Sequence, residues 1–250
     1  MLTTRVDAVS WDGAVEQIQR WAHARESRAI YFCNVHAVVT ACRDLELAAA
    51  FAAGDLLLPD GDPVAWTLRR AGYRGQTRIS GPDLMPALLA RAEGVGLSVY
   101  FYGDHPSTLQ SLRQVLQRDL PALRVAGLHS PPFQDMTPEQ DRQIVEQINA
   151  SGANIVFVAL GCPKQEKWIA AHRGRIAAPM LGVGAAFGFH AGAKRRAPRW
   201  VRRCGLEWLH RLASEPRRLF RRYAVTNTIF IWATFKSLFW RSASDLSRRR

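Results

Sequence analysis

The sequence predicts an α/β protein, in which a Rossmann-like, mostly parallel sheet flanked by helices is followed by a basic, aromatic-rich helical C-terminal appendage. Two observations predict this class. Short apolar runs alternate with helical stretches over residues 1–193, and the excess positive charge of the chain lies entirely beyond them. Alternating strands and helices are typical of a parallel sheet that is covered by helices on both faces.

The strands are expected at short apolar runs that end in glycine, proline or polar residues. These runs are residues 29–33, 56–58, 97–102, 123–127, 154–160 and 180–183.

The helices are expected between the strands, at residues 36–53, 82–93, 106–118, 138–150 and 164–175. Pro82, Pro106 and Pro138 stand in first turns, where the missing N–H of proline is tolerated. Thr137 directly precedes one of these prolines and is a typical helix cap.

The charge divides the chain after residue 193. Residues 1–193 carry 18 Lys and Arg against 18 Asp and Glu, whereas residues 194–250 carry 16 against 3, which accounts for the formal net charge of +13. We therefore expect a catalytic core over residues 1–193 and an appendage over residues 194–250. Arginine predominates in the appendage and binds phosphate through a planar fork of donors. Such a segment favours nucleic acid, an anionic membrane surface or phosphorylated ligands.

Large aromatic residues are interleaved with these arginines. They include Trp200, Trp208, Phe220, Tyr223 and Trp232. A disordered nucleic-acid-binding tail is normally poor in large apolar groups, whereas aromatic residues mixed with arginine are typical of a membrane interface. We expect the appendage to dock on an anionic membrane surface. Residues 223–240 come nearest to a spanning helix but contain Asn227, Lys236 and three threonines, so a single span is the alternative.

The cysteines indicate a reducing compartment. Cys33, Cys42, Cys162 and Cys204 are scattered, and no C-x-x-C pair predicts a zinc or redox site. Residues 1–9 lack the apolar stretch of a secretory signal. We expect a cytoplasmic protein that is peripheral on the inner face of the membrane, without a metal site or a cofactor.

Candidate functional residues follow the expected strands, because open α/β sheets bind ligands at the carboxyl ends of their strands. Asp60 lies in Pro59-Asp60-Gly61, directly after the strand at 56–58. A carboxylate there can act as a general base on a hydroxyl, or it can cap the next helix. Asp60-Gly61-Asp62 is also a D-x-D triplet, a weak indication of a divalent metal on a nucleotide diphosphate.

Two glycine-containing loops are further candidates. Gly161 to Glu166 opens a helix whose free N–H groups favour an anion, with Lys164 adding charge and Gln165 offering a donor and an acceptor; a solvated polar face is the alternative. Gly182-Val183-Gly184-Ala185-Ala186-Phe187 resembles a dinucleotide fingerprint but ends in phenylalanine and lacks the matching acid, so we reject NAD binding. Its glycines would permit close approach of the backbone to a ligand.

Taken together, these loops resemble the WecG/TagA/CpsF family of bacterial glycosyltransferases over residues 5–235. The family's G-x-P-K-Q-E element is Gly161 to Glu166, its P-D-G element is Pro59 to Gly61, and its R-x-x-G-x-D-L element is Arg78 to Leu84. The other matching stretches are Gly182-Val-Gly-Ala-Ala-Phe-Gly-Phe-His-Ala-Gly192, Arg196-Ala-Pro-Arg-Trp200, Gly205-Leu-Glu-Trp208, Arg211-Leu, and Glu215-Pro-Arg-Arg-Leu219 through Arg222-Tyr223.

The resemblance implies an inverting transfer of a sugar from a UDP-sugar to a polyprenyl-diphosphate-linked sugar in cell-surface polysaccharide synthesis. The sugar would be of the N-acetylmannosamine type, a uronic acid or a hexose. Asp60 matches the catalytic base. The substrate-binding positions are Asn34, Arg78, Gly161, Lys164, Gln165, Glu166, Gly184, Arg211, Arg218 and Arg221. The last three arginines would hold the diphosphate as the appendage closes over the active site, in place of a metal.

Two departures from the family pattern concern the pocket. Phe32 stands where the family's T-x-N has threonine, and Gly188 stands where its F-D-F has aspartate. Asp62 and Pro63 also replace small residues after P-D-G. We expect the missing hydroxyl and carboxylate to bear on which sugar is bound.

Two other functions compete with a transferase. A nucleic-acid-binding protein would use the basic appendage and bind in a salt-sensitive way. However, the appendage reads as amphipathic helices, and the neutral core has enzyme-like loops. A Rossmann oxidoreductase would need the fingerprint that is missing here. We therefore expect no nucleic-acid partner, and a homo-oligomer is compatible with the sequence.

Overall fold

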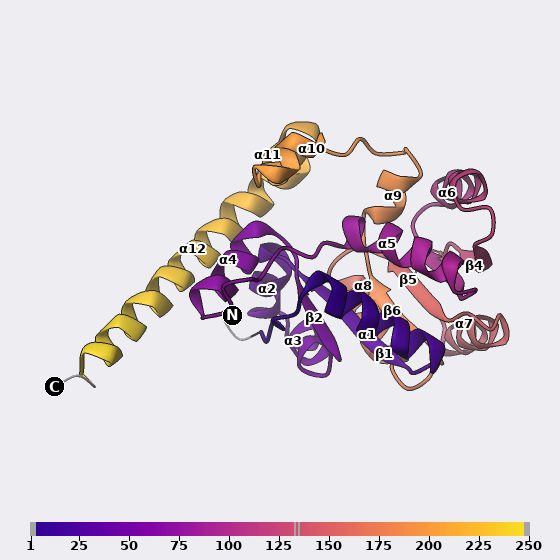
Figure 1. Ribbon diagram of the computed structural model, residues 1–250, viewed down its shortest axis with the longest axis horizontal. Coiled ribbons are helices and arrows are strands. Elements are labelled where there is room, and N and C mark those ends of the chain that lie inside the picture. The colour runs from indigo at the N-terminus through magenta and orange to yellow at the C-terminus, as the bar shows by residue number, and fades with distance from the viewer. Residues whose placement is uncertain (1–3, 133, 135, 248–250) are drawn as a thin grey trace.

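The computed structural model describes residues 4–132, 134 and 136–247, without the side chains at positions 199, 203, 211, 218, 221, 222, 235 and 237–247. At its centre is a six-stranded sheet with the order β2-β1-β6-β5-β3-β4, in which neighbouring strands are parallel (Figure 1). The strands are β1 (Arg28–Cys33), β2 (Leu56–Pro59), β3 (Ser98–Gly103), β4 (Arg124–His129), β5 (Ile155–Ala159) and β6 (Pro179–Gly182). The expected α/β class is confirmed.

Helices connect the strands and continue beyond the last of them. They are α1 (Trp11–His23), α2 (Val35–Ala41), α3 (Leu45–Ala52), α4 (Asp62–Arg70), α5 (Gly81–Gly94), α6 (Pro106–Asp119), α7 (Pro138–Ala150), α8 (Lys164–His172), α9 (Ala186–His190), α10 (Arg199–Arg203), α11 (Glu207–Ser214) and α12 (Pro216–Ser247).

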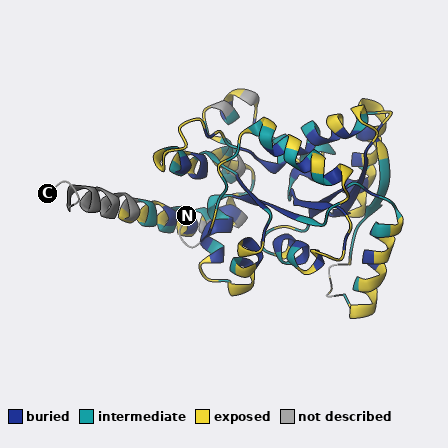
Figure 2. Cartoon of the chain, turned by 60° about the horizontal axis from the view of Figure 1, so that its bottom comes forward, coloured by how far each residue is buried: buried dark blue, intermediate teal, exposed yellow. Residues whose placement is uncertain are grey.

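Two helical layers cover the sheet. Helices α1, α5, α6 and α9 pack on one face, and α2, α3, α7 and α8 pack on the other. Successive strand residues enter the two cores in turn, so Phe32 of β1 lies in the first core and Tyr31 in the second. Because both faces are covered, the central strands are largely apolar, which is why they stand out as continuous runs in the sequence, whereas the edge strand β4 is only partly buried. Figure 2 shows this buried centre between the exposed outer surfaces of the helices.

The structure differs from the expected elements in three places. The expected helix at 36–53 is two helices, α2 and α3, because the Asp44 side chain accepts a hydrogen bond from the Leu47 N–H at 3.0 Å and caps a new helix. Helix α8 ends at His172 rather than at residue 175. Helices α1 and α4 have no counterpart among the expected elements, and Pro63 lies in the first turn of α4.

The appendage consists of α10, α11 and the long helix α12, which runs away from the sheet (Figure 1). Phe230 of α12 is buried against Val39 of α2 and Val64 of α4. Among the described residues, no helix combines the length and the apolar character that crossing a membrane requires. The boundary between residues 193 and 194 stays a prediction.

Candidate active site

A cavity of about 590 Å³ lies at the carboxyl ends of the strands. Its lining includes a residue that follows each of five strands: Asp60 after β2, Asn34 after β1, Gly184 after β6, Gly161 after β5 and Asp104 after β3. These strands are consecutive in the sheet, so the cavity follows the sheet edge from β2 to β3. This is the edge at which open α/β sheets bind ligands.

Asp60 and Asn34 lie side by side because their strands are paired. Cys33 at the end of β1 is in register with Pro59 at the end of β2, and the next residue of each strand lines the cavity. The Asn34 side-chain oxygen accepts a hydrogen bond from the Ala37 N–H at 3.0 Å and caps α2. Its Nδ2 donates to the Asp60 carboxylate at 3.3 Å. Asn34 therefore both begins a helix and orients a carboxylate.

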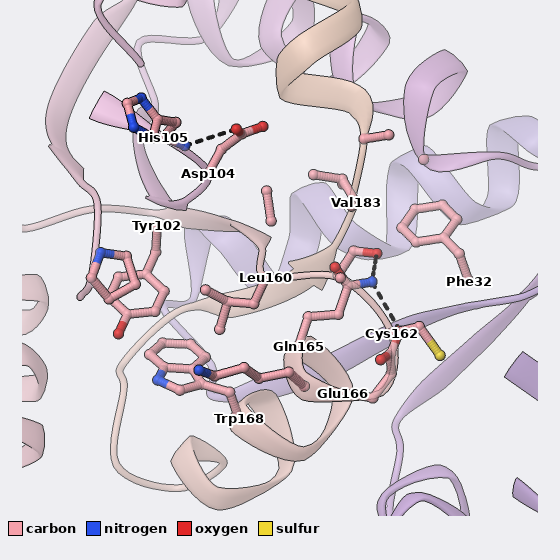
Figure 3. Close-up of a pocket in the computed structure, with 18 of the residues that line it drawn as sticks. Phe32, Tyr102, Asp104, His105, Leu160, Cys162, Gln165, Glu166, Trp168 and Val183 are labelled. Atoms are coloured by element: carbon pink, nitrogen blue, oxygen red, sulfur yellow. Dashed lines mark hydrogen bonds between the residues drawn. The ribbon is translucent and has the colours of Figure 1, made fainter. Parts of the chain in front are cut away.

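Gln165 and Glu166, at the start of α8, form a buried polar wall of the cavity (Figure 3). Their exposed fractions are 6% and 2%. Gln165 donates from Nε2 to the Gly182 carbonyl and to Glu166 Oε1, each at 2.9 Å. A Cβ added at Gly184 would lie 3.6 Å from Gln165 Oε1, in a backbone conformation with φ of +55° that favours glycine. The bare backbone after β6 thus leaves room beside Gln165.

The β3 end of the cavity is aromatic. Tyr102 of β3 and Trp168 of α8 both line it and stack with their ring centroids 4.4 Å apart. Figure 3 shows these rings on one side of the cavity and Phe32 and Val183 on the opposite side. Met136 adds to the apolar surface at this end. The β3 end of the cavity therefore combines an aromatic wall with the polar side chains of Asp104 and His105.

Lysines bring positive charge to this cavity. Lys164 and Lys194 line it, and neither forms an ion pair with a residue that the structure describes. The neighbouring Lys167 differs, because it is paired with Asp44 and Glu46 at 2.8 Å each. Two lysines of the cavity are thus available to an anionic ligand.

An ion-pair cluster of Arg78, Asp83, Arg196, Arg202 and Glu207 joins the core to the appendage. Arg78 contacts Asp83 at 3.2 Å and Glu207 at 3.1 Å, and Asp83 also contacts Arg196 at 2.7 Å and Arg202 at 3.1 Å. Burial opposes the charge of Arg78, but the neighbouring carboxylates, chiefly Glu207, raise its pKa above the usual value. Arg78 is therefore held in its charged form by two carboxylates that it shares with Arg196 and Arg202.

A second cavity of about 340 Å³ lies between the core and the appendage. Asn34, Asp60 and Pro82 line both cavities. The second cavity has a largely apolar wall from the appendage, made by Trp208, Tyr223, Phe230 and Ile231. Asp60 therefore lies where the two cavities meet.

The described residues offer no group of three or more His, Cys, Asp and Glu side chains that could hold a metal ion. The two carboxylates of the D-x-D triplet line different cavities. Asp60 lines both the first and the second cavity, whereas Asp62 lines only the second.

Comparison with known proteins decides the family. The glycosyl transferase WecG/TagA/CpsF family matches residues 1–244. The chain belongs to this family. An N-acetylglucosaminyldiphosphoundecaprenol N-acetyl-beta-D-mannosaminyltransferase of Bacillus spizizenii is similar to it, with 33% identity over 180 residues, 71% of this chain and 67% of the relative. The protein is thus a glycosyltransferase, as its motifs predict.

The residues that the sequence singled out in this glycosyltransferase fall into three groups. Those that line the first cavity are Asp60, Asn34, Gly161, Lys164, Gln165, Glu166 and Gly184. Arg78 lines the second cavity and is held by the ion-pair cluster. Arg211 lies on α11 and Arg218 and Arg221 lie on α12, but their side chains are outside the described part of the structure. The roles of all these residues stay predictions.

Several residues of the site escaped the sequence analysis. Tyr102 and Trp168 read as parts of a strand and a helix, and nothing local indicates that they share a cavity wall. Lys194 is hidden within the basic segment at the start of the appendage. Asp83 and Glu207 lie inside matched motifs, R-x-x-G-x-D-L and G-L-E-W, and that membership is the signal that could have found them.

Proposed function

We propose that this glycosyltransferase transfers N-acetylmannosamine from its UDP-activated form to N-acetylglucosamine that is linked through a diphosphate to a polyprenol. The observation that carries the proposal is the place of Asp60 at the junction of two cavities. A transferase must bring a donor and an acceptor together at one base, and two cavities that share one carboxylate meet that requirement.

The order of the chemical groups in the donor matches the lining of the first cavity in one orientation. A UDP-sugar has the order base, ribose, diphosphate, sugar. The cavity has Tyr102 and Trp168 at the β3 end and Asp60 at the β2 end, and Lys164 and Lys194 also line it. Four strand spacings separate the two ends, roughly 19 Å. The base would lie against the aromatic end, and the anomeric carbon would lie near Asp60.

The transfer step would be a single displacement. The acceptor hydroxyl oxygen forms a bond to the anomeric carbon, and the bond from that carbon to the β-phosphate oxygen breaks, with its electron pair leaving on UDP. The hydroxyl proton passes to the Asp60 carboxylate. One displacement inverts the anomeric centre without a covalent intermediate. Cations near the diphosphate stabilise the charge that develops on UDP.

The acceptor fits the second cavity. Its aromatic and aliphatic wall from α11 and α12 suits the apolar start of a polyprenyl chain, while Asp60 and Asn34 face the acceptor sugar. The activity for which the Bacillus spizizenii relative is named supports an N-acetylglucosaminyl-diphosphate-polyprenol as that acceptor. Following the family resemblance, Arg211, Arg218 and Arg221 would hold the leaving diphosphate of the donor as the appendage closes over the active site.

A membrane surface is the expected site of action for such an acceptor. The appendage exposes Trp200, Phe220 and Trp232, each by about two thirds of its surface. These aromatic side chains lie on helices rich in arginine, and each cation near an anionic leaflet can contribute about 1 kcal/mol. Co-sedimentation with anionic vesicles should therefore exceed that with zwitterionic vesicles. A Trp200→Ser, Trp232→Ser double variant should lose most of the difference, and equal sedimentation on both vesicles would contradict docking.

The activity is tested by offering UDP-sugars, one at a time, with a polyprenyl-diphosphate-linked N-acetylglucosamine and detecting the product by mass spectrometry. UDP-N-acetylmannosamine should give a product that is heavier by one N-acetylhexosamine unit. Transfer of a uronic acid or a hexose instead would support the transferase activity but contradict N-acetylmannosamine as the donor sugar. Failure of every UDP-sugar on this acceptor would overturn the proposal.

A further inference from the structure

The segment after β6 places a lysine over a glycine at the rim of the first cavity. The chain passes through α9 and reverses, and the Lys194 N–H donates to the Gly188 carbonyl at 2.9 Å. A Cβ added at Gly188 would lie only 3.2 Å from Cδ and 3.3 Å from Cγ of Lys194. The methylene stem of Lys194 thus lies against the bare backbone of Gly188. A Cβ at position 188 would require this stem to shift by a few tenths of an ångström, and a larger side chain would displace it further.

Lys194 differs from the neighbouring arginines in its ion pairing. Arg78, Arg196 and Arg202 contact carboxylates of the ion-pair cluster, whereas Lys194 has no ion-pair partner among the described residues. Lys194 lines the first cavity and not the second. In the proposed arrangement, which puts the donor in the first cavity, an anion bound by Lys194 belongs to the donor rather than to the acceptor.

The contacts of its chain neighbours distinguish Lys194 from Lys164. His190 and Arg196, on either side of Lys194, contact the Pro82 carbonyl at 3.2 and 3.3 Å, and Pro82 lines both cavities as Asp60 does. Lys164 instead opens α8 after β5, two strands from the β1 end that carries Asn34. In a donor that has its sugar at Asp60 and its base at Tyr102, the β-phosphate lies nearer to Asp60 than the α-phosphate does. We propose that Lys194, seated over Gly188, binds the β-phosphate of the donor, the phosphate that departs with UDP. This assignment rests on the proposed function.

The proposal makes Gly188 a determinant of donor binding without any contact of its own. Glycine leaves the space in which the lysine stem lies, and a larger residue moves the ammonium group away from the phosphate. An ammonium group binds phosphate as a compact point charge, so its position decides its effect.

The experiment measures the dissociation constants of UDP and UMP by calorimetry, without acceptor, on the full-length protein. UMP lacks the β-phosphate. Lys194→Met should weaken UDP binding on the order of tenfold to a hundredfold, as expected for one charge-assisted contact, and leave UMP binding nearly unchanged. Lys194→Arg should recover most of the loss. Arg195→Met is the matched control, because Arg195 is exposed and does not line the cavity, and its UDP binding should equal that of the wild type.

The contact between the two residues is tested by combining variants. Gly188→Ala should weaken UDP binding in the wild type but have no further effect on Lys194→Met, since neighbouring residues that act together are not additive. Equal effects of Gly188→Ala in both backgrounds would overturn the role of Gly188.

The negative outcomes of this experiment distinguish a failure of the Lys194 assignment from a failure of the proposed function. If the wild type binds UDP and Lys194→Met binds it equally well, the assignment of Lys194 is wrong and the proposed function stands. If Lys194→Met weakens UDP and UMP to the same extent, the lysine does not bind the β-phosphate. If the wild type binds neither nucleotide, the UDP donor is wrong and this assignment falls with it.

Discussion

The side chain of Asn34 donates a hydrogen bond to the carboxylate of Asp60 across 3.3 Å while it caps helix α2 through the N–H of Ala37. The cap fixes the backbone of Asn34, and the paired ends of β1 and β2 fix its distance from Asp60. The direction in which the Asp60 carboxylate points therefore depends on secondary structure rather than on a solvated, rotating partner. Such support from helices and strands is what a proposed base needs in order to stay aimed at a hydroxyl.

Replacing Asp60 by asparagine should remove the proposed base without changing its shape. We expect turnover to fall by about 10²–10⁴, as for loss of general base catalysis, while the dissociation constant of UDP changes little. Steady-state kinetics and UDP calorimetry on the same preparation check both. A variant with turnover near that of the wild type would remove Asp60 from the catalytic role.

Two substitutions of Asn34 separate its structural role from its orienting role. Asn34→Ala should lower both turnover and stability, the latter by about 1 kcal/mol for a lost helix cap. Asn34→Ser keeps a capping oxygen but is too short to reach Asp60, so stability should return and turnover should stay low. Thermal unfolding and kinetics measure the two effects. Full turnover in the serine variant would show that the Asp60 contact is dispensable.

The ion-pair cluster should govern how the appendage sits on the core. Glu207→Gln leaves Arg78 with one carboxylate fewer in a half-buried setting. We expect faster hydrogen exchange in α11 and a higher KM for the lipid-linked acceptor. Glu139→Gln, which weakens an exposed ion pair with Arg142 on α7, is the control and should change neither quantity. An unchanged KM and unchanged exchange in Glu207→Gln would refute the role of the cluster.

The same cluster should respond to acid. Burial by itself would raise the pKa of Asp83, but the hydrogen bond from Ser80 and the charges of Arg196 and Arg78 hold it below the usual range. A lowered pKa means that the stabilisation is complete above the unfolded value, about 3.9, and is lost as the pH falls further. Hydrogen exchange in α11 should accelerate only below about pH 4. Faster hydrogen exchange in α11 already near neutral pH would show that a titratable group other than Asp83 controls it.

Asp55 should make the largest acid-sensitive contribution away from the site. Burial opposes its charge, yet hydrogen bonds from Arg173, the Ala29 N–H and Arg28 hold its pKa at about 2. Its stabilisation is therefore present above about pH 4 and is lost between about pH 4 and pH 2. Asp55→Asn should lower the free energy of unfolding on the order of 2 kcal/mol at neutral pH. It should also make that free energy depend less on pH in this window. A variant that retains the wild-type pH dependence would contradict this assignment.

The transferase should work without a divalent metal, because lysines and arginines can stabilise the departing diphosphate. Activity in excess EDTA should stay near that in buffer alone. Its disappearance, with recovery on addition of Mg²⁺ or Mn²⁺, would favour the D-x-D interpretation of Asp60 and Asp62 and weaken the assignment of Asp60 as a base.

The sequence by itself determined the α/β class, the family and the strand-end loops that carry Asp60, Asn34, Gly161 to Glu166 and Gly184. These are local properties: a buried parallel strand is a continuous apolar run, and the loop after it is recognisable beside it. The sequence predicted the helix boundaries less well than the strands. A single cap at Asp44 divides a stretch of uniformly helical composition into α2 and α3.

Only the tertiary structure decided which distant residues share a surface. The order β2-β1-β6-β5-β3-β4 places Asp60 and Tyr102 at opposite ends of one cavity, and no short-range pattern encodes that order. The same holds for Arg78, which pairs with Glu207 across 129 positions of the chain, and for Lys194, whose place in the cavity depends on the turn that returns it to Gly188. Contacts of this kind arise when strands and helices pack, so their physical cause lies in the assembled fold rather than in neighbouring residues.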